Sequence, residues 1–331
     1  MITESQIVAI LEAFAVGDAM GMPTEFMTRS EIVTSLGQVI GLIDSSFSAH
    51  HSDLPKGSVT DDTEQTLYLL EHYLDEGVSV DTTVNGLLSW IEESNAIEKR
   101  YIGPSSLKAL QAIQEGTDPK EAGKTGTTCG GLMRSLAPTL YAASRNLKRD
   151  EMLNLIVICL MPTHFTSQAL EAACAYGSAV YAALEGSSVE EIVQAALEGG
   201  SYGINQAPFQ GCSASSTARL KYIVEYQKLH PTKDELMDFL FSVLGTGLPS
   251  EDVFGAVMAL FLYEPGNTFQ SICLAASLGG DTDTIAALVG GLNRAYDSKS
   301  EIPQSILDSV YEVNKLPLHQ IASRLIATGR E

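Results

Sequence analysis

The feature that most constrains the fold of this chain is the spacing of its apolar residues, which recurs every three or four positions through most of the sequence. This spacing places apolar side chains on one face of a helix, whereas a half-buried strand alternates apolar with polar residues. Near the N-terminus, Ile7, Ile10 and Phe14 follow the helical period, and Thr3 with Gln6 forms a predicted capping box. The chain is therefore predicted to begin with a capped helix.

The same period predicts helices along the rest of the chain, and it predicts that the first helix runs out into a glycine-rich turn at residues 17–21. The other predicted helices span residues 60–77, 80–92, 105–115, 150–160, 167–184, 188–197, 213–229, 232–241, 251–263, 269–276, 282–294 and 303–314. Residues 44–56 are rich in Ser, His, Asp and Pro and are predicted to form a loop. No strand pair, repeat or composition break is found. We therefore predict one all-α domain over residues 1–331.

The charge of the chain limits its partners. It has 41 acidic and 20 basic residues, which give a formal net charge of -21. This charge repels nucleic acid and anionic membrane surfaces, so binding to either is not expected. The five cysteines lie far apart without zinc-site spacing, and neither a signal peptide nor a membrane-spanning segment is recognised. We predict a cytoplasmic protein with reduced thiols.

Two acidic clusters lie at predicted helix starts, T-D-D-T at residues 60–63 and G-G-D-T-D-T at residues 279–284. Either cluster alone is explained by helix capping, because Thr and Asp accept hydrogen bonds from free N–H groups there. Brought together, however, their four carboxylates repel one another unless cations neutralise them. Carboxylate and hydroxyl oxygens without Cys or His suit Mg²⁺, Mn²⁺ or Ca²⁺. The residues themselves indicate a metal-assisted hydrolase or phosphoryl-transfer enzyme of unnamed substrate.

These clusters follow G-D-A-M-G at residues 17–21 and Glu25, and in this order they resemble the ADP-ribosylglycohydrolase family over nearly the whole chain. Three intermediate motifs are also similar, I-G-P-S-S at 102–106, G-G-L-M-R at 130–134 and P-T-H at 162–164. The resemblance implies a compact many-helix fold, of the type found in dinitrogenase reductase-activating glycohydrolases, with a two-metal cleft. It also implies hydrolysis of the C1″ ribosyl bond of ADP-ribosylated substrates.

The resemblance implies a role for each matching residue of this chain. Two divalent cations, Mg²⁺ or Mn²⁺, would be held by Thr60, Asp61, Asp62, Asp281, Asp283 and Thr284. The implied catalytic residues are Asp62 and Glu25, with Glu25 either taking a proton from water as a base or gating the cleft. The implied substrate-binding residues are Tyr101, Gly130, Gly131, Met133 and His164, of which the last lies beside the ligand phosphates.

Plainer interpretations of several of these residues stay open. Glu25 follows Pro23 and suits a surface position, and His164 suits a hydrogen-bonded loop. Residues 126–134 form either a glycine-rich loop that cradles a pyrophosphate with backbone N–H groups or a tight turn into a helix. His50 and His51 are predicted to be solvated loop residues.

Two positions depart from the arginine-specific members of the family. Many of these carry Asp directly before the Ile-Gly motif, where this chain has Tyr101, and often Asn before the glycine-rich motif, where it has Cys129. The chain looks closer to the uncharacterised bacterial branch. We therefore predict poor cleavage of ADP-ribosyl-arginine, unless Tyr101 packs behind the helix and another acid such as Glu98 serves. An N-riboside or nucleoside hydrolase and a non-catalytic structural or binding relative are the alternatives, and the intact acids argue against the latter.

Overall fold

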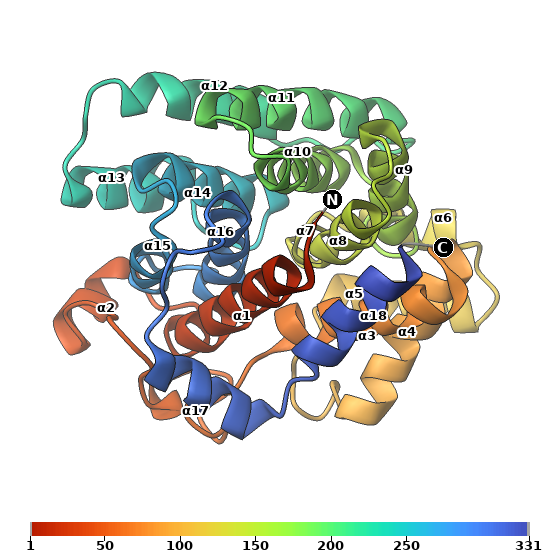
Figure 1. Ribbon diagram of the computed structural model, residues 1–331, viewed down its shortest axis with the longest axis horizontal. Helices are drawn as coiled ribbons and strands as arrows, with labels where there is room; N and C mark the ends of the chain where they lie inside the picture. The colour runs from red at the N-terminus through yellow and green to blue at the C-terminus, as the bar shows by residue number, and fades with distance from the viewer. Residues whose placement is uncertain (1, 330–331) are drawn as a thin grey trace.

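The computed structural model describes residues 2–329, and helices form nearly all of its regular structure (Figure 1). The helices are α1 (Glu4–Gly21), α2 (Arg29–Ser35), α3 (Asp61–Glu76), α4 (Val80–Ser94), α5 (Pro104–Gln114), α6 (Pro119–Ala122), α7 (Gly130–Arg134), α8 (Leu136–Ser144), α9 (Arg149–Leu160), α10 (Ser167–Leu184), α11 (Val189–Gln206), α12 (Ser216–Gln227), α13 (Lys233–Phe239), α14 (Ser250–Tyr263), α15 (Thr268–Ala276), α16 (Thr282–Tyr296), α17 (Gln304–Asn314) and α18 (Leu318–Thr328). Short 3-10 helices span Met22–Thr24, Ser45–Phe47 and Gly123–Thr125, and a π-helical turn spans Leu240–Leu244. Within residues 2–329 no strand forms, and only two isolated bridges occur. The prediction of an all-α fold is confirmed.

Most predicted helices begin and end close to the observed bounds, with one large error and five omissions. Helix α11 continues to Gln206, beyond the predicted end at Leu197. It continues because its glycines pack against other helices: a Cβ at Gly203 would lie 2.2 Å from the carbonyl oxygen of Leu170 in α10. The omitted helices are α2, α6, α7, α8 and α18. Helices α2, α6, α7 and α8 have nine residues or fewer, and short apolar segments carry the weakest periodic signal. Helix α18 has 11 residues and was missed despite a length equal to that of α5 and α17.

The glycine-rich turn predicted at residues 17–21 is wrong, because these residues form the last turn of α1. A Cβ at Gly17 would lie 2.2 Å from the carbonyl oxygen of Ala286, and a Cβ at Gly21 would lie 2.3 Å from that of Thr282. The two glycines therefore allow α1 to contact the backbone of α16 directly. This contact places Asp18 of α1 beside the first turn of α16.

We expect Gly21→Ala to weaken this helix contact. The added methyl group has no space, so the free energy of unfolding should fall by about 1–3 kcal/mol, as for other overpacked cores. Urea denaturation followed by circular dichroism measures the change. Gly41→Ala is the control, because a Cβ there would meet its nearest neighbour at 3.9 Å. Equal stability of the two variants would contradict the close contact.

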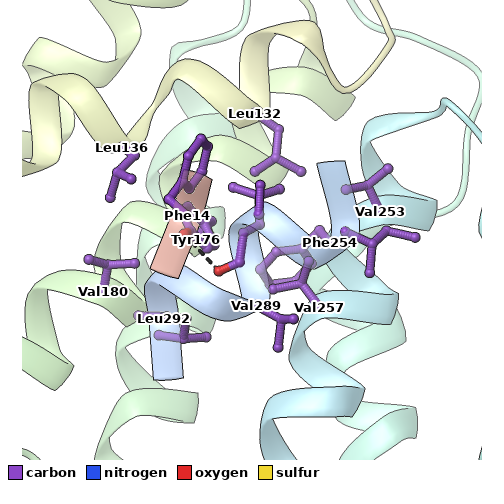
Figure 2. Close-up of a cluster of buried hydrophobic side chains, with 14 of the residues drawn as sticks. Phe14, Leu132, Leu136, Tyr176, Val180, Val253, Phe254, Val257, Val289 and Leu292 are labelled. Atoms are coloured by element: carbon purple, nitrogen blue, oxygen red, sulfur yellow. Dashed lines mark hydrogen bonds between the residues drawn. The ribbon is translucent and has the colours of Figure 1, made fainter. Parts of the chain in front are cut away.

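A core of buried apolar side chains lies where α1, α7, α10, α14 and α16 meet. Figure 2 shows Phe14, Leu132 and Phe254 in this cluster together with Tyr176 of α10. The Tyr176 hydroxyl donates to the carbonyl oxygen of Leu288 in α16 at 3.0 Å. This hydrogen bond offsets the cost of burying the Tyr176 hydroxyl and holds α10 against α16.

Residues Glu4–Thr24 form a stretch that is long and apolar enough to cross a membrane, with a mean hydropathy of 1.4. It is the one such stretch within the described part of the chain. Surrounding helices bury 94% of it, and Figure 1 shows α1 in the middle of the molecule. Packing in the protein core therefore accounts for its apolar composition.

Candidate metal centre

The two acidic clusters begin α3 and α16, as the sequence predicts. The N-cap residues are Thr60 and Asp281, and neither side chain makes a capping hydrogen bond. Instead, the Thr60 hydroxyl donates to Oδ1 of Asp18 at 2.7 Å. Helix capping by these two residues therefore does not explain the clusters.

Asp18 connects α1 to the start of α3, although the sequence analysis gave it no role. Its carboxylate is fully buried and accepts hydrogen bonds from the backbone N–H and the hydroxyl of both Thr60 and Thr63, at 2.6 to 3.1 Å. It satisfies N–H groups at the helix start that otherwise have no partner. Asp18 is the one charged residue in the apolar stretch from Ala13 to Gly21 of α1, and a charged residue in such a stretch is a signal that would have identified it from sequence.

The structure brings both clusters together around Asp283. Carboxylate oxygens of Asp18, Asp62 and Asp283 lie within 4.8 Å of one another, and so do oxygens of Glu25, Asp281 and Asp283. Two overlapping groups of acids thus share one residue. Helices α1, α3 and α16 and the segment after α1 all contribute to the centre.

The remaining two predicted ligands lie at the same helix starts. The Thr284 hydroxyl donates to Oδ2 of Asp62 at 3.4 Å. Asp61 is partly buried and accepts from Nε2 of Gln65 at 3.0 Å. Both residues line the cavity described below.

The chemistry of this centre fits oxygen-ligated divalent cations. Within residues 2–329, four buried carboxylate oxygens of this centre have no hydrogen-bond partner, namely Glu25 Oε2, Asp62 Oδ1, Asp281 Oδ2 and Asp283 Oδ1. A buried, unpaired carboxylate oxygen is costly, and several such oxygens together also repel one another. Mg²⁺, Mn²⁺ and Ca²⁺ take six or more oxygen ligands and would supply the missing partners.

Burial raises the pKa of every carboxyl group in the centre. The pKa rises to about 6 for Asp18, and it lies above its ordinary value for Glu25, Asp61, Asp62, Asp281 and Asp283. Neighbouring carboxylates raise it further for Glu25, Asp61, Asp62 and Asp283. Without cations, the centre therefore retains protons that ordinary carboxyl groups release.

The backbone before α16 holds Glu25 next to this centre. Gly280 has a φ of 87°, and a Cβ there would lie 2.0 Å from the carbonyl oxygen of Thr246, so only glycine fits. The N–H of Asp281 donates to the same Thr246 oxygen at 2.7 Å, and the N–H of Phe26 donates to the Gly280 oxygen at 2.8 Å. Gly280 thus lies where three chain segments meet, namely the segment at Phe26, the segment at Thr246 and the start of α16.

Glu25 is buried and does not occupy the surface position suggested by Pro23. Its Oε2 lies 3.7 Å from Nε2 of His51. His51 is also buried, so its predicted position as a solvated loop residue is wrong, while His50 is exposed. Burial lowers the pKa of His51, which therefore carries no charge at neutral pH.

The acids line a cavity of about 240 Å³. Its lining residues are Glu25, Phe26, His50, His51, Asp61, Asp62, Arg100, Tyr101, Ile102, Gly103, Pro104, Ser106, Thr128, Cys129, Gly130, Met133, Leu248, Asp281, Asp283 and Thr284. Three predicted site residues, Thr60, Gly131 and His164, lie behind this lining. The cavity is large enough for part of a nucleotide-sized ligand beside the acids.

A family model of ADP-ribosylglycohydrolases matches residues 2–331. The chain belongs to the ADP-ribosylglycohydrolase family. The uncharacterised protein YegU of Escherichia coli K12 is 27% identical over 328 residues, which cover 97% of this chain and 96% of that protein. The ADP-ribosylarginine hydrolase Tri1 of Pseudomonas putida is 25% identical over 311 residues, which cover 91% of this chain and 72% of that protein. A solved structure described as an ADP-ribosylglycohydrolase-related protein complex shares the fold, with a TM-score of 0.71 and 23% identity over 99% of this chain and 98% of its own.

The chain has a short helix where its sequence suggests a glycine-rich loop. Residues 130–134 form α7, which agrees with the alternative of a tight turn into a helix. Cys129 precedes α7, is buried, and has its Sγ 3.9 Å from the Thr284 hydroxyl. The segment at residues 126–129 therefore connects the cavity wall to the acidic centre.

Tyr101 both lines the cavity and packs in a small cluster. It is buried with Trp90 and Ala96, and its hydroxyl donates to the carbonyl oxygen of Val59 at 3.2 Å. Its ring meets the ring of His51 edge-on at 5.2 Å. The packing proposed as the alternative for Tyr101 is therefore present, and its contact with substrate stays a prediction. Glu98 is exposed and does not line the cavity.

Proposed function

We propose that this chain is a divalent-cation-dependent hydrolase that cleaves the C1″ ribosyl bond of ADP-ribosylated substrates. The observation that supports it best is the meeting of two acidic helix starts at Asp283, with unpaired buried carboxylate oxygens beside a cavity. The proposed ligands of two cations, Mg²⁺ or Mn²⁺, are Thr60, Asp61, Asp62, Asp281, Asp283 and Thr284. Such cations polarise ribose hydroxyls and lower the pKa of a water molecule.

In this proposal, protein side chains accept the proton that is released by the attacking water. Glu25 has a buried, unpaired oxygen at the cavity, and burial together with Asp281 raises the pKa of its carboxyl group. Bound cations would favour the ionised form of Glu25, whose oxygen could then accept a proton from the attacking water. The neutral ring of His51 lies next to it and offers a second proton acceptor.

The surrounding carboxylates also suit the charge that develops on the substrate. Cleavage of a glycosidic bond passes through an oxocarbenium-like transition state, in which positive charge builds up on the ribose. Asp62 lines the cavity, so its negative charge would lie near that ribose. Tyr101, Gly130 and Met133 would form the substrate walls, with Gly131 and His164 supporting them from behind.

Two further properties belong to the same proposal. We propose a single domain, on the basis of the large buried apolar cluster that includes both Ile7 and Leu325. We also propose a cytoplasmic location, because all five cysteines are free and four of them are buried.

A hydrolysis panel with Mg²⁺, Mn²⁺ or a chelator tests the function. The substrates are ADP-ribosyl-arginine, ADP-ribosyl-serine, O-acetyl-ADP-ribose and simple nucleosides. We expect release of ADP-ribose only when a divalent cation is present. Turnover confined to nucleosides would favour the riboside hydrolase, and ADP-ribose binding without any turnover would favour a non-catalytic relative.

Tyr101 leads us to predict that ADP-ribosyl-arginine is cleaved at least about tenfold more slowly than an O-linked or base-linked substrate. A guanidinium leaving group is positively charged, and a carboxylate would attract it, whereas burial keeps the pKa of Tyr101 above its ordinary value and its ring neutral. The similarity to the ADP-ribosylarginine hydrolase Tri1 gives the opposite expectation, namely that ADP-ribosyl-arginine is cleaved well. Values of kcat/KM for the arginine-linked and the O-linked or base-linked substrates decide between these two expectations.

Two variants test the role of Tyr101 in this preference directly. Tyr101→Asp should raise arginine cleavage relative to serine cleavage, while Tyr101→Phe should leave the ratio unchanged because it removes only the hydrogen bond to Val59. Comparable wild-type rates on the two linkages would refute the prediction.

A further inference from the structure

A fully buried arginine lies beneath the segment that forms one wall of the cavity. Arg134 ends α7, and no ion pair involving it occurs within residues 2–329. Its Nη1 donates to Oε1 of Gln65 at 3.3 Å, and its Nη2 donates to Oγ1 of Thr163 at 2.7 Å. Nη2 also lies 3.0 Å from Nδ1 of His164. A buried cation without a carboxylate partner is costly, which suggests that it serves a purpose other than stability.

The contact with Arg134 determines which nitrogen of His164 carries the hydrogen. A guanidinium group can only donate, so Nδ1 must accept. The Thr163 hydroxyl accepts from Arg134 and can donate its own hydrogen to Nδ1 at 2.9 Å. Burial and the neighbouring Arg134 charge also lower the pKa of His164, so its ring stays neutral. The hydrogen therefore lies on Nε2.

The Nε2 hydrogen is directed at Thr128. Nε2 of His164 lies 3.0 Å from Oγ1 of Thr128, so the Thr128 oxygen accepts this bond. The hydroxyl hydrogen of Thr128 is then free for another acceptor. Thr128 lines the cavity beside Gly130 and Met133, and the sequence analysis did not identify it.

Three glycines hold the imidazole ring in this orientation. A Cβ at Gly126 would lie 2.9 Å from Cδ2 of His164, one at Gly130 would lie 3.2 Å from Cε1, and one at Gly131 would lie 2.8 Å from Cβ. The backbone thus packs closely against the ring, and the contacts of Nδ1 with Arg134 and of Nε2 with Thr128 set its orientation. The direction of the Nε2–H group is fixed before any ligand binds.

We propose that Arg134 is a positioning residue that acts through His164 to direct the Thr128 hydroxyl hydrogen into the cavity, where it donates to a phosphate oxygen of the substrate. The identity of this anion as the pyrophosphate of ADP-ribose rests on the proposed function. The Arg134 charge also adds a local positive potential beneath this wall in a chain of net charge -21. The wall therefore favours an anion where the protein as a whole repels one.

The tautomer is tested first, in the ligand-free protein. Nitrogen-15 NMR of labelled histidines, with His164 assigned from a His164→Asn spectrum, should show hydrogen on Nε2 and none on Nδ1. Arg134→Met should shift His164 towards a mixture of tautomers, and Arg134→Lys, which retains a donor, should restore the original form. A wild-type His164 with its hydrogen on Nδ1 overturns the proposal even if the Arg134 variants do not fold.

The Thr128 hydroxyl is tested by calorimetry with ADP-ribose and with adenosine, which has no phosphate. Thr128→Val should weaken ADP-ribose binding about tenfold and leave adenosine binding unchanged, because it removes only the donor. Thr128→Ser should restore most of the ADP-ribose affinity. Equal ADP-ribose affinity of the wild type and Thr128→Val overturns the proposal. A protein that binds ADP-ribose through Thr128 but hydrolyses none of the substrate panel supports this inference and overturns the proposed function.

Discussion

Asp62→Asn and Asp283→Asn should each lower kcat/KM by at least about 100-fold, which exceeds the usual effect of losing a residue that only supports a metal ligand. Each substitution keeps the shape of the side chain but removes one of the negative charges that would bind the cations. Asp283 should have the larger effect, because its oxygens belong to both groups of acids. The measurement is steady-state hydrolysis at saturating Mg²⁺ or Mn²⁺.

The same variants should fold normally, and their ion-free forms should be more stable than the ion-free wild type. Each removes a buried carboxylate that neighbouring carboxylates repel, and neither empties a core position. Circular dichroism and thermal melting in chelator measure both effects. Asp308→Asn is the matched control, because Asp308 is exposed on α17 and, in the described part of the chain, its carboxylate accepts a hydrogen bond from Gln304 alone. Retained turnover in both site variants would remove the cations from the mechanism.

The ion-free protein should lose stability as the pH rises from about 4 through 7, and Mg²⁺ or Mn²⁺ should reverse that loss. The folded pKa of Asp18 is about 6, and that of Asp62 and Asp283 lies well above the ordinary 3.8. The folded state therefore holds protons that the unfolded chain has released. This contribution to stability is fully present below the unfolded pKa and is lost as the pH rises through the folded pKa.

Cation binding opposes this loss of stability at higher pH, because the acidic side chains bind cations in their deprotonated, carboxylate form. At a cation concentration of about 1,000 times Kd, the folded state gains about 4 kcal/mol, which corresponds to a rise in Tm of about 6 °C for a chain of 331 residues. Scanning calorimetry at pH 5 and pH 8, with chelator or with cation, should show a larger rise at pH 8. Asp283→Asn should reduce this cation-dependent rise in Tm. A Tm that responds neither to pH nor to divalent cations would refute the presence of a cation site.

The sequence was sufficient for the features that depend on neighbouring residues. The apolar period of α10 gave its bounds at Ser167 and Leu184, and the capping box of Thr3 and Gln6 is present as predicted. The acidic clusters begin α3 and α16 because helix starts are specified within a few residues. The resemblance to a family then indicated that the two helix starts belong to one site.

Other features depend on residues that meet only in the folded chain. Asp18 accepts its hydrogen bonds from residues 42 and 45 positions away, and the Thr24 hydroxyl bonds to Thr282 across 258 positions. Gly21 was predicted to lie in a turn, because the local sequence contains no sign of its contact with Thr282.

Burial was likewise decided by the tertiary structure. His51 resembles any polar loop residue in the sequence, yet its ring is enclosed and faces Glu25. The hydrogen of His164 is placed by Arg134, which lies 30 positions earlier in the chain. Local sequence thus determined which residues are helical and where the acids begin a helix, because those preferences act over a single turn. The tertiary structure alone decided which polar groups lose water and which atoms then satisfy them, because both depend on packing between distant segments.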